Sequence, residues 1–330
     1  MGVSANCEQH RVPGEPGRAA AAAALLGGVF VFLQACSIEE LAGIDMPEVP
    51  DDDVSLALIA TIGSQTLAPM FGGGGRYQLG YAAAVAARGG SVFVVDSAAG
   101  GVVRIDPSLT RAELLYPLGD PTTRGLHVTR DLLIYVVDRQ ERAVIELSDT
   151  GAPRRHFSDS SLLPAPVDLA LTNWDATLVV ADELTAQLVV FDSMGGPTAV
   201  LGSNIAGPRI ASTMQAISGG GNGVYVLDGG LQEVVHFDLA GRPLGGYGED
   251  DLVAPVAMTV DECGRVFVAD GHPQGLFVGL GGVFGHGMRV PFDASINPAV
   301  TDLWIDGDEL YVAAGAAGIQ VYLVEPGCPR

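Results

Sequence analysis

Residues 92–96 read Val-Phe-Val-Val-Asp, and this short apolar pattern returns five more times along the chain. Five of the six copies end in Asp, and the last one ends in Ala314. The end positions are 42 to 46 residues apart. Short runs rich in β-branched and aromatic residues, separated by Gly, Asp and Asn at even spacing, are typical of β-strands. The copies occupy residues 92–96, 134–138, 178–182, 224–228, 266–270 and 310–314.

The flanks of the pattern repeat as well. A second apolar segment ends ten residues after each copy, and another segment ends ten residues before it. A weaker fourth segment closes most units with an apolar residue and Gly, as at Leu118-Gly119 and Tyr247-Gly248. Four strands in about 44 residues are typical of a propeller blade. The sequence therefore predicts an all-β, six-bladed β-propeller with four-stranded blades over residues 54–330. The alternative is a β-sandwich whose strands happen to be evenly spaced.

The repeat resembles the NHL type of six-bladed propeller. Residues 260–270 read Val-Asp-Glu-Cys-Gly-Arg-Val-Phe-Val-Ala-Asp, and residues 188–192 read Leu-Val-Val-Phe-Asp. The resemblance covers about residues 54–325. The chain departs from the NHL pattern in two ways. The loop after the Asp that ends each strand pattern lacks the usual Asn and Arg, and the last copy of the pattern ends in Ala314.

The last unit contains only three of the four expected strands before the chain ends. Residues 56–63 read Leu-Ala-Leu-Ile-Ala-Thr-Ile-Gly and end like the other outer strands. Adding this segment to the last blade would place both ends of the domain in one sheet and remove an unpaired edge. We therefore expect an N-terminal strand to close the ring.

The first 35 residues are typical of an export signal. Arg11 and Arg18 precede an apolar run from Ala19, and a small residue precedes Cys36. The tetrad Leu-Gln-Ala-Cys at residues 33–36 resembles the lipobox of bacterial lipoproteins, which implies lipid attachment at Cys36. The alternatives are an ordinary signal peptide and a single anchor helix. The lipobox implies a cell-envelope protein on an outer-membrane or periplasmic side, with residues 36–53 as an acidic, Pro-containing tether.

The composition excludes several classes of protein. The 330 residues are 48% hydrophobic and 17% charged, which excludes disorder. The 45 Gly and 20 Pro exclude a long coiled coil. The net charge of −22, with Arg as its only basic residue type, disfavours nucleic acid as a partner because phosphates would be repelled.

The aspartates that end the strand pattern recur in five units, which favours a structural role at turns. A functional residue should instead break the repeat. Fourteen residues before each pattern end, Arg124 and Asp168 are the two polar exceptions, and Asp302 is a third on its own strand. Arg124 and Asp168 either form a salt bridge across the tunnel or hold a polar ligand.

The loops after the pattern supply two more candidate ligand-binding residues. Glu183 follows Asp182, and His272 lies in a loop that departs from the repeat. The alternative is that His272 is an exposed turn residue that binds no ligand. We expect these loops and the starts of the inner strands to share one face of the ring, and His156, His236 and His286 to lie away from the tunnel.

Two functions from different classes remain open. The first is a non-catalytic scaffold or binding module without a cofactor, whose partner is an envelope protein or a small ligand. The second is a calcium-dependent lactonase, hydrolase or lyase, which would use Asp168, Glu183 and Asp302. A zinc lyase of the amidating type would need several convergent histidines.

Cys263 and Cys328 are predicted to form a disulfide bond. Cys263 lies in the first turn of the fifth unit, and Cys328 follows the third strand of the sixth. The two units are neighbours, and the compartment implied by the export signal is oxidising.

Overall fold

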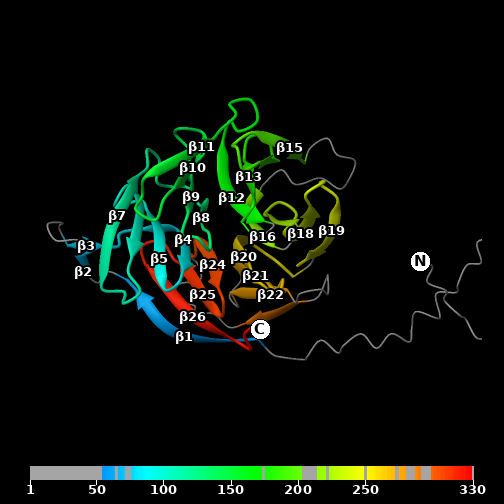
Figure 1. Ribbon diagram of the computed structural model, residues 1–330. Helices are drawn as coiled ribbons and strands as arrows, with labels where there is room; N and C mark the ends of the chain where they lie inside the picture. The colour runs from blue at the N-terminus through cyan, green and yellow to red at the C-terminus, as the bar shows by residue number, and fades with distance from the viewer. Residues whose placement is uncertain are drawn as a thin grey trace, which may run out of the picture. The chain divides into compact units, whose positions relative to one another are not determined.

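The computed structural model describes ten stretches of the chain between Val54 and Cys328. Every described residue belongs to one compact unit, Asp52–Arg330. This unit is built of strands arranged in six sheets around a central axis (Figure 1). The described residues are 54–63, 66–70, 76–172, 175–202, 214–220, 223–248, 251–271, 275–279, 287–290 and 299–328.

The predicted six-bladed β-propeller is confirmed, and the blades follow one another in chain order. The strands of blades 1 to 3 run from the centre outward as follows. Blade 1 contains β4 (Ala82–Arg88), β5 (Ser91–Asp96), β6 (Gly101–Ile105) and β7 (Arg111–Pro117). Blade 2 contains β8 (Leu126–Val128), β9 (Ile134–Asp138), β10 (Ala143–Leu147) and β11 (Pro153–Phe157). Blade 3 contains β12 (Pro166–Thr172), β13 (Thr177–Asp182), β14 (Gln187–Phe191) and β15 (Pro197–Leu201).

The remaining three blades repeat this antiparallel order. Blade 4 contains β16 (Met214–Gly220), β17 (Gly223–Asp228), β18 (Glu233–Asp238) and β19 (Pro243–Tyr247). Blade 5 contains β20 (Pro255–Val260), β21 (Val266–Asp270), β22 (Leu276–Gly279) and β23 (Gly287–Val290). Blade 6 contains β24 (Asp302–Asp306), β25 (Glu309–Ala313), β26 (Ile319–Glu325) and β1 (Ser55–Ile62).

Strand β1 closes the ring as the sequence predicts. It runs antiparallel to β26, from the Ser55–Glu325 pair to the Ile62–Ile319 pair. The first strand of the domain thus becomes the outer strand of the last blade, and the two ends of the chain share one sheet. Blade 6 would expose the edge of β26 without it.

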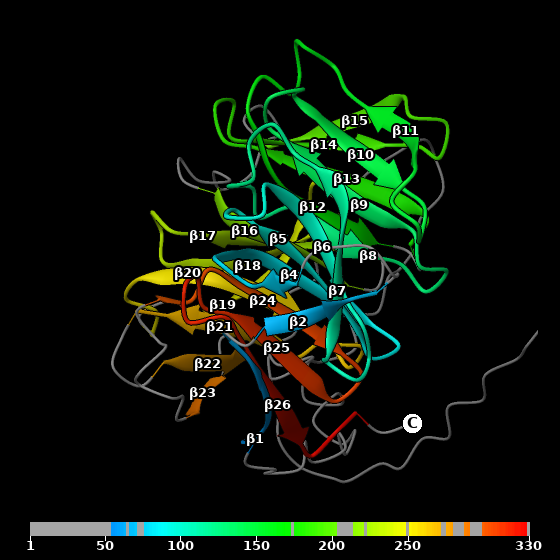
Figure 2. The ribbon, with the colours of Figure 1, turned by 90° about the vertical axis from the view of Figure 1, so that its left-hand side faces the viewer.

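Blade 1 is larger than the sequence predicts. Strand β2 (Thr66–Pro69) pairs parallel with β7, and β3 (Tyr77–Gln78) pairs with β2, so the sheet has six strands. Figure 2 shows β2 lying across the outer side of this blade. The Tyr77 hydroxyl donates to the Asp96 carboxylate, which ties this extension to the inner part of the blade.

The core lies between the blades. Each of six apolar clusters contains side chains from two neighbouring blades, and together the clusters complete the circle. The second strands of blades 1 and 2 are buried along their whole length, because a neighbouring blade covers each face. This explains why the strands read as continuous apolar runs and not as alternating ones.

The aspartates that end the strand pattern are structural, as predicted. Asp96 is fully buried, and its carboxylate accepts hydrogen bonds from the backbone N–H groups of Gly80, Tyr81 and Ala98. Asp270 accepts from Val253 and Ala254 in the same way. The carboxylates of Asp96 and Asp182 each join the loop that enters a blade to the loop that follows its second strand.

Candidate functional site

Asp168 and Asp302 occupy equivalent positions on the innermost strands of blades 3 and 6. Asp168 pairs with Ala181, and Asp302 pairs with Ala313, in each case one residue before the end of the strand pattern. Counting fourteen residues back from the pattern end had placed Asp302 two residues away from the level of Asp168. That offset is wrong because the turns differ in length: four residues separate Thr172 from its partner Thr177, whereas two separate Asp306 from its partner Glu309.

The two carboxylates also make the same hydrogen bonds. Asp168 accepts from the backbone N–H of Leu169 (2.8 Å) and from that of Ile217 in blade 4 (2.8 Å). Asp302 accepts from Leu303 (2.9 Å) and from Val85 in blade 1 (2.9 Å). Each carboxylate therefore fixes the inner strand of its own blade to that of the next blade.

Arg124 reaches across the centre from the segment that precedes β8. Its Nη1 donates to the carbonyl of Val256 in blade 5 (2.9 Å) and lies 3.4 Å from the carbonyl and side-chain oxygens of Gln215 in blade 4. In the described part of the chain, no carboxylate lies within 4.0 Å of this guanidinium, so the direct Arg124–Asp168 salt bridge is not formed.

The environment of the two carboxyl groups favours their neutral forms. Burial raises the pKa of Asp168 to about 7, although its two backbone hydrogen bonds and the charge of Arg124 oppose this rise. The pKa of Asp302 is raised well above its ordinary value by burial and by the charge of Asp168. The two groups and Arg124 therefore form one electrostatic unit.

A cavity of about 470 Å³ adjoins this unit at the centre of the ring. The inner strands of blades 2 to 6 supply its walls, whereas blade 1 contributes only Arg88. The exposed lining residues Arg130, Glu262 and Gly307 all lie in turns between first and second strands. We call this end the mouth, and the end at Asp168 and Asp302 the inner end.

Charged side chains at the mouth are paired with one another. Arg88 Nη1 lies 2.6 Å from Asp306 Oδ1, and Arg130 Nη2 lies 3.1 Å from Glu262 Oε1. His127 Nε2 lies 3.5 Å from an oxygen of Asp175. Burial lowers the pKa of His127, while Asp175 acts in the opposite direction.

The small side chains of β4 make room for two rings from the adjacent blades. His127 of blade 2 and Trp304 of blade 6 meet edge to face, with ring centroids 4.7 Å apart. Trp304 Nε1 donates to the backbone carbonyl of Ala87 in β4, at 2.9 Å. These rings line the cavity on the blade 1 side of the centre.

Tyr225 and His236 form an aromatic wall on the other side of the cavity. Their rings stack with centroids 4.0 Å apart and nearly parallel planes. The wall depends on glycines: a Cβ at Gly220 would lie 2.8 Å from the Tyr225 ring, and one at Gly223 would lie 2.5 Å from His236 Nε2. The expectation that His236 lies away from the tunnel is wrong, because the missing side chains let a third-strand residue reach the cavity.

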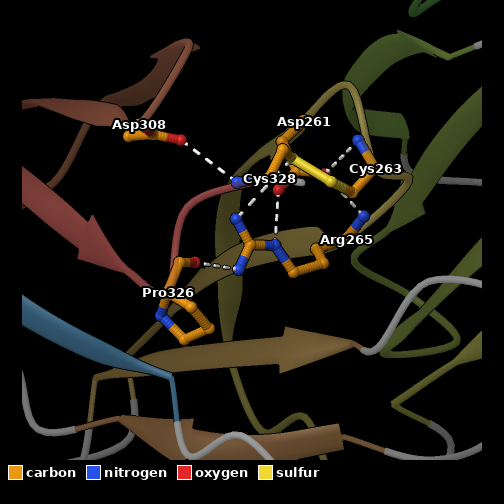
Figure 3. The surroundings of a disulfide bond; sticks show 6 residues. All are labelled: Asp261, Cys263, Arg265, Asp308, Pro326 and Cys328. Carbon is orange, nitrogen blue, oxygen red and sulfur yellow. Dashed lines mark hydrogen bonds and ion pairs between the residues drawn. A yellow bond between two sulfur atoms is a disulfide. The ribbon is translucent and has the colours of Figure 1, made fainter. Parts of the chain in front are cut away.

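A disulfide joins Cys263 to Cys328 beside the mouth, with Cα atoms 5.8 Å apart (Figure 3). Arg265 lies under this bond and donates to Asp261 Oδ2 (2.5 Å) and to the Pro326 carbonyl (2.7 Å). The disulfide therefore attaches the C-terminal tail of blade 6 to the first turn of blade 5.

This corner also contains a group of potential metal ligands. Among the described residues, Asp261, Cys263 and Cys328 are the set of three whose ligand atoms lie within 4.8 Å of one another. The two sulfurs are bonded to each other and are not thiolates, the form that binds metal. These three residues therefore lie together because of the disulfide bond, and their proximity does not indicate a metal site.

The other residues singled out by the sequence lie elsewhere. Glu183 is exposed outside the cavity, and its carboxylate lies 3.3 Å from Arg139 of blade 2. His272 and Cys36 lie outside the described residues. The cavity thus brings together Arg124, Asp168 and Asp302 and leaves Glu183 out.

The comparisons with known proteins bear on the fold. No protein-family model and no curated protein matches the chain. A Bacteroides thetaiotaomicron structural genomics protein of unknown function is similar in structure, with 17% identity, a TM-score of 0.57, and coverage of 83% of this chain and 77% of that chain. Virginiamycin B lyase from Staphylococcus aureus is similar too, with 12% identity, a TM-score of 0.58, and coverage of 82% and 99%.

A catalytically inactive variant of that lyase with quinupristin gives 11% identity and a TM-score of 0.57, covering 83% of this chain and 99% of that chain. Similarity at this level of identity establishes the propeller fold. Within the described ranges, no helix has the length and hydropathy that a membrane crossing requires.

Proposed function

We propose that this chain is a non-catalytic binding module of the cell envelope, an NHL-like propeller held to a membrane by lipid at Cys36. Its ligand would be a small molecule in the central cavity or an envelope protein on the ring. One observation carries the proposal: the two carboxylates at the inner end are each held by two backbone amides, one of them from a neighbouring blade.

The carboxylates of Asp168 and Asp302 are held in position before a ligand binds. A carboxylate has about four lone-pair positions, and the backbone amides occupy two of them on each aspartate. The remaining positions can accept hydrogen bonds without a change in side-chain conformation, which reduces the ordering cost of binding. The cavity volume is also within the range of small-molecule sites, roughly 300–1,000 Å³.

The path of the chain fits a tethered propeller. Strand β1 begins at Ser55 beside Glu325, and the tail after Glu325 continues to the disulfide at the mouth. The chain therefore enters the ring on the mouth side. A tether of residues 36–53 could span at most about 60 Å, at about 3.3 Å per residue.

A calcium-dependent lactonase, hydrolase or lyase is the second candidate. The raised pKa of Asp168 and Asp302 favours it, because carboxyl groups that titrate near neutrality are common in general acid–base catalysis. Two features oppose the calcium form of this function. Each carboxylate oxygen already accepts an amide hydrogen bond, and the charge of Arg124 at the same end repels a divalent cation.

Calcium titration separates the two candidates. The purified chain should show no stoichiometric heat of binding when calcium chloride is added in a calorimeter, and Asp168→Asn and Asp302→Asn should behave identically to the parent. Binding of one calcium ion per chain that both variants abolish would overturn the proposed function in favour of the enzyme.

The anchor is tested separately. Cys36→Ala should move the protein from the membrane fraction to the soluble fraction, and the mass of the parent protein should include a lipid on a mature N-terminal Cys36. Cys36→Ala that stays in the membrane fraction would contradict lipid anchoring but leave the cavity argument unaffected.

A further inference from the structure

The inner end of the cavity holds two carboxyl groups and one guanidinium. At the mouth, Arg88 is paired with Asp306 and Arg130 with Glu262, so these charges compensate one another. At the inner end, two carboxyl groups share the field of one guanidinium, that of Arg124. When both carboxyl groups are ionised they exceed the charge of Arg124 by one, so a second positive charge would favour their ionised forms and bring this end to neutrality. The chain as a whole carries −22, which also raises the local concentration of cations.

The walls between the two ends are apolar and aromatic. Leu171, Ile217 and Met258 line the cavity, and the stacked rings of Tyr225 and His236 form one side. Such walls suit a ligand with an apolar or aromatic body, and aromatic faces also attract organic cations. An inorganic cation would leave these walls without contacts.

We propose that the cavity binds a small arylalkylammonium ion, with its ammonium group at Asp168 and Asp302 and its aromatic ring against Tyr225 and His236. An ammonium group has three N–H donors, which match the lone pairs that the two carboxylates retain. Arg124 donates to blades 4 and 5 and not to the two carboxylates, so it does not occupy the lone pairs that they retain. This inference rests on the proposed function as a binding module.

Three probes of matched shape test the ligand class on the full-length protein. They are 2-phenylethylammonium, its neutral isostere 2-phenylethanol and its anionic counterpart 3-phenylpropanoate, each titrated at neutral pH by calorimetry. The ammonium ion should bind one per chain and at least about tenfold more tightly than the alcohol, because a hydrogen bond between charged partners is worth more than a neutral one. The propanoate should not bind.

Substitutions then locate the site. Asp168→Asn and Asp302→Asn should each weaken binding of the ammonium ion by about tenfold or more. Asp149→Asn removes the same charge from an exposed turn outside the cavity and should leave binding unchanged. Thermal unfolding identifies a variant that has not folded, and the ranking of the three probes on the parent protein tests the proposal without any variant.

The outcomes are distinct. Tighter binding of the propanoate or the alcohol, or no binding of any probe, would overturn the ligand class while leaving the proposed function to the calcium titration. Equal weakening by Asp149→Asn would show that the probe responds to net charge alone, which would also overturn the proposal.

Discussion

Asp168 and Asp302 perform the same structural task in blades 3 and 6: each accepts a hydrogen bond from the backbone N–H of the next blade, Ile217 for the first and Val85 for the second. The other blades have no carboxylate at the equivalent inner-strand position; Ala84, Ala216 and Ala257 occupy it in blades 1, 4 and 5. The pair is therefore a local departure from the repeat, and it also forms the inner end of the cavity.

Removing either carboxylate should destabilise the ring. Asp168→Ala leaves the buried N–H of Ile217 without an acceptor, which costs about 1–3 kcal/mol in the free energy of unfolding. Asp168→Asn retains one acceptor oxygen and should cost less. Urea unfolding of the parent and both variants measures the difference. Equal stability of Asp168→Ala and the parent would show that the amide finds another partner.

The stability of the fold should depend on pH through Asp168. Its folded pKa, about 7, lies above the unfolded value of 3.8, so the folded state binds the proton more tightly. Stability from this group is therefore fully present at low pH and is lost as pH rises from about 4 to about 7. The free energy of unfolding of the parent should fall over this range relative to that of Asp168→Asn. A constant difference between the two proteins across these pH values would contradict the raised pKa.

The closing strand should contribute to the stability of the whole ring. Ile62 of β1 is fully buried against the apolar cluster between blades 6 and 1, whereas Ile59 of the same strand is 51% exposed. Ile62→Ala should lower the free energy of unfolding by about 2–5 kcal/mol, and Ile59→Ala by no more than about 0.5 kcal/mol. Both are read from a single unfolding transition. Similar losses from the two variants would contradict the burial pattern of β1.

The disulfide should stabilise the domain by restricting its unfolded state. The bond closes a loop of 65 residues, which corresponds to about 4 kcal/mol in the chain-entropy description. Cys328→Ser should lower the free energy of unfolding by up to this amount. The double variant Cys263→Ser/Cys328→Ser should be no less stable than Cys328→Ser alone. Additive losses would mean that the cysteines act independently of their bond.

The fold was predictable because the strand pattern of one blade recurs six times in the sequence. Each blade needs the same buried second strand, and five of the six end it with an aspartate that accepts hydrogen bonds from an adjoining loop, so the pattern appears at regular intervals in the sequence. Closure by residues 56–63 was predictable because the last blade lacks an outer strand. The extension of blade 1 by β2 and β3 was not, because these strands are short and occur once.

The candidate site was predictable only in part. Arg124, Asp168 and Asp302 stand out from the repeat, but the common level of the two aspartates depends on turns of different length, which a fixed residue count does not reveal. Tyr225 and His236 belong to a second and a third strand, and they reach the cavity because Gly220 and Gly223 lack side chains. The run Ala-Ala-Ala-Val-Ala-Ala at residues 82–87 was the available signal that other side chains would cover blade 1.

The most direct test of the account is a crystal structure of the protein grown with both 2-(4-bromophenyl)ethylammonium and calcium chloride. The anomalous signal of bromine should appear inside the cavity beside Tyr225 and His236, with the ammonium nitrogen within hydrogen-bond distance of Asp168 and Asp302. A calcium ion bound between the two aspartates, with bromine absent from the cavity, would contradict it.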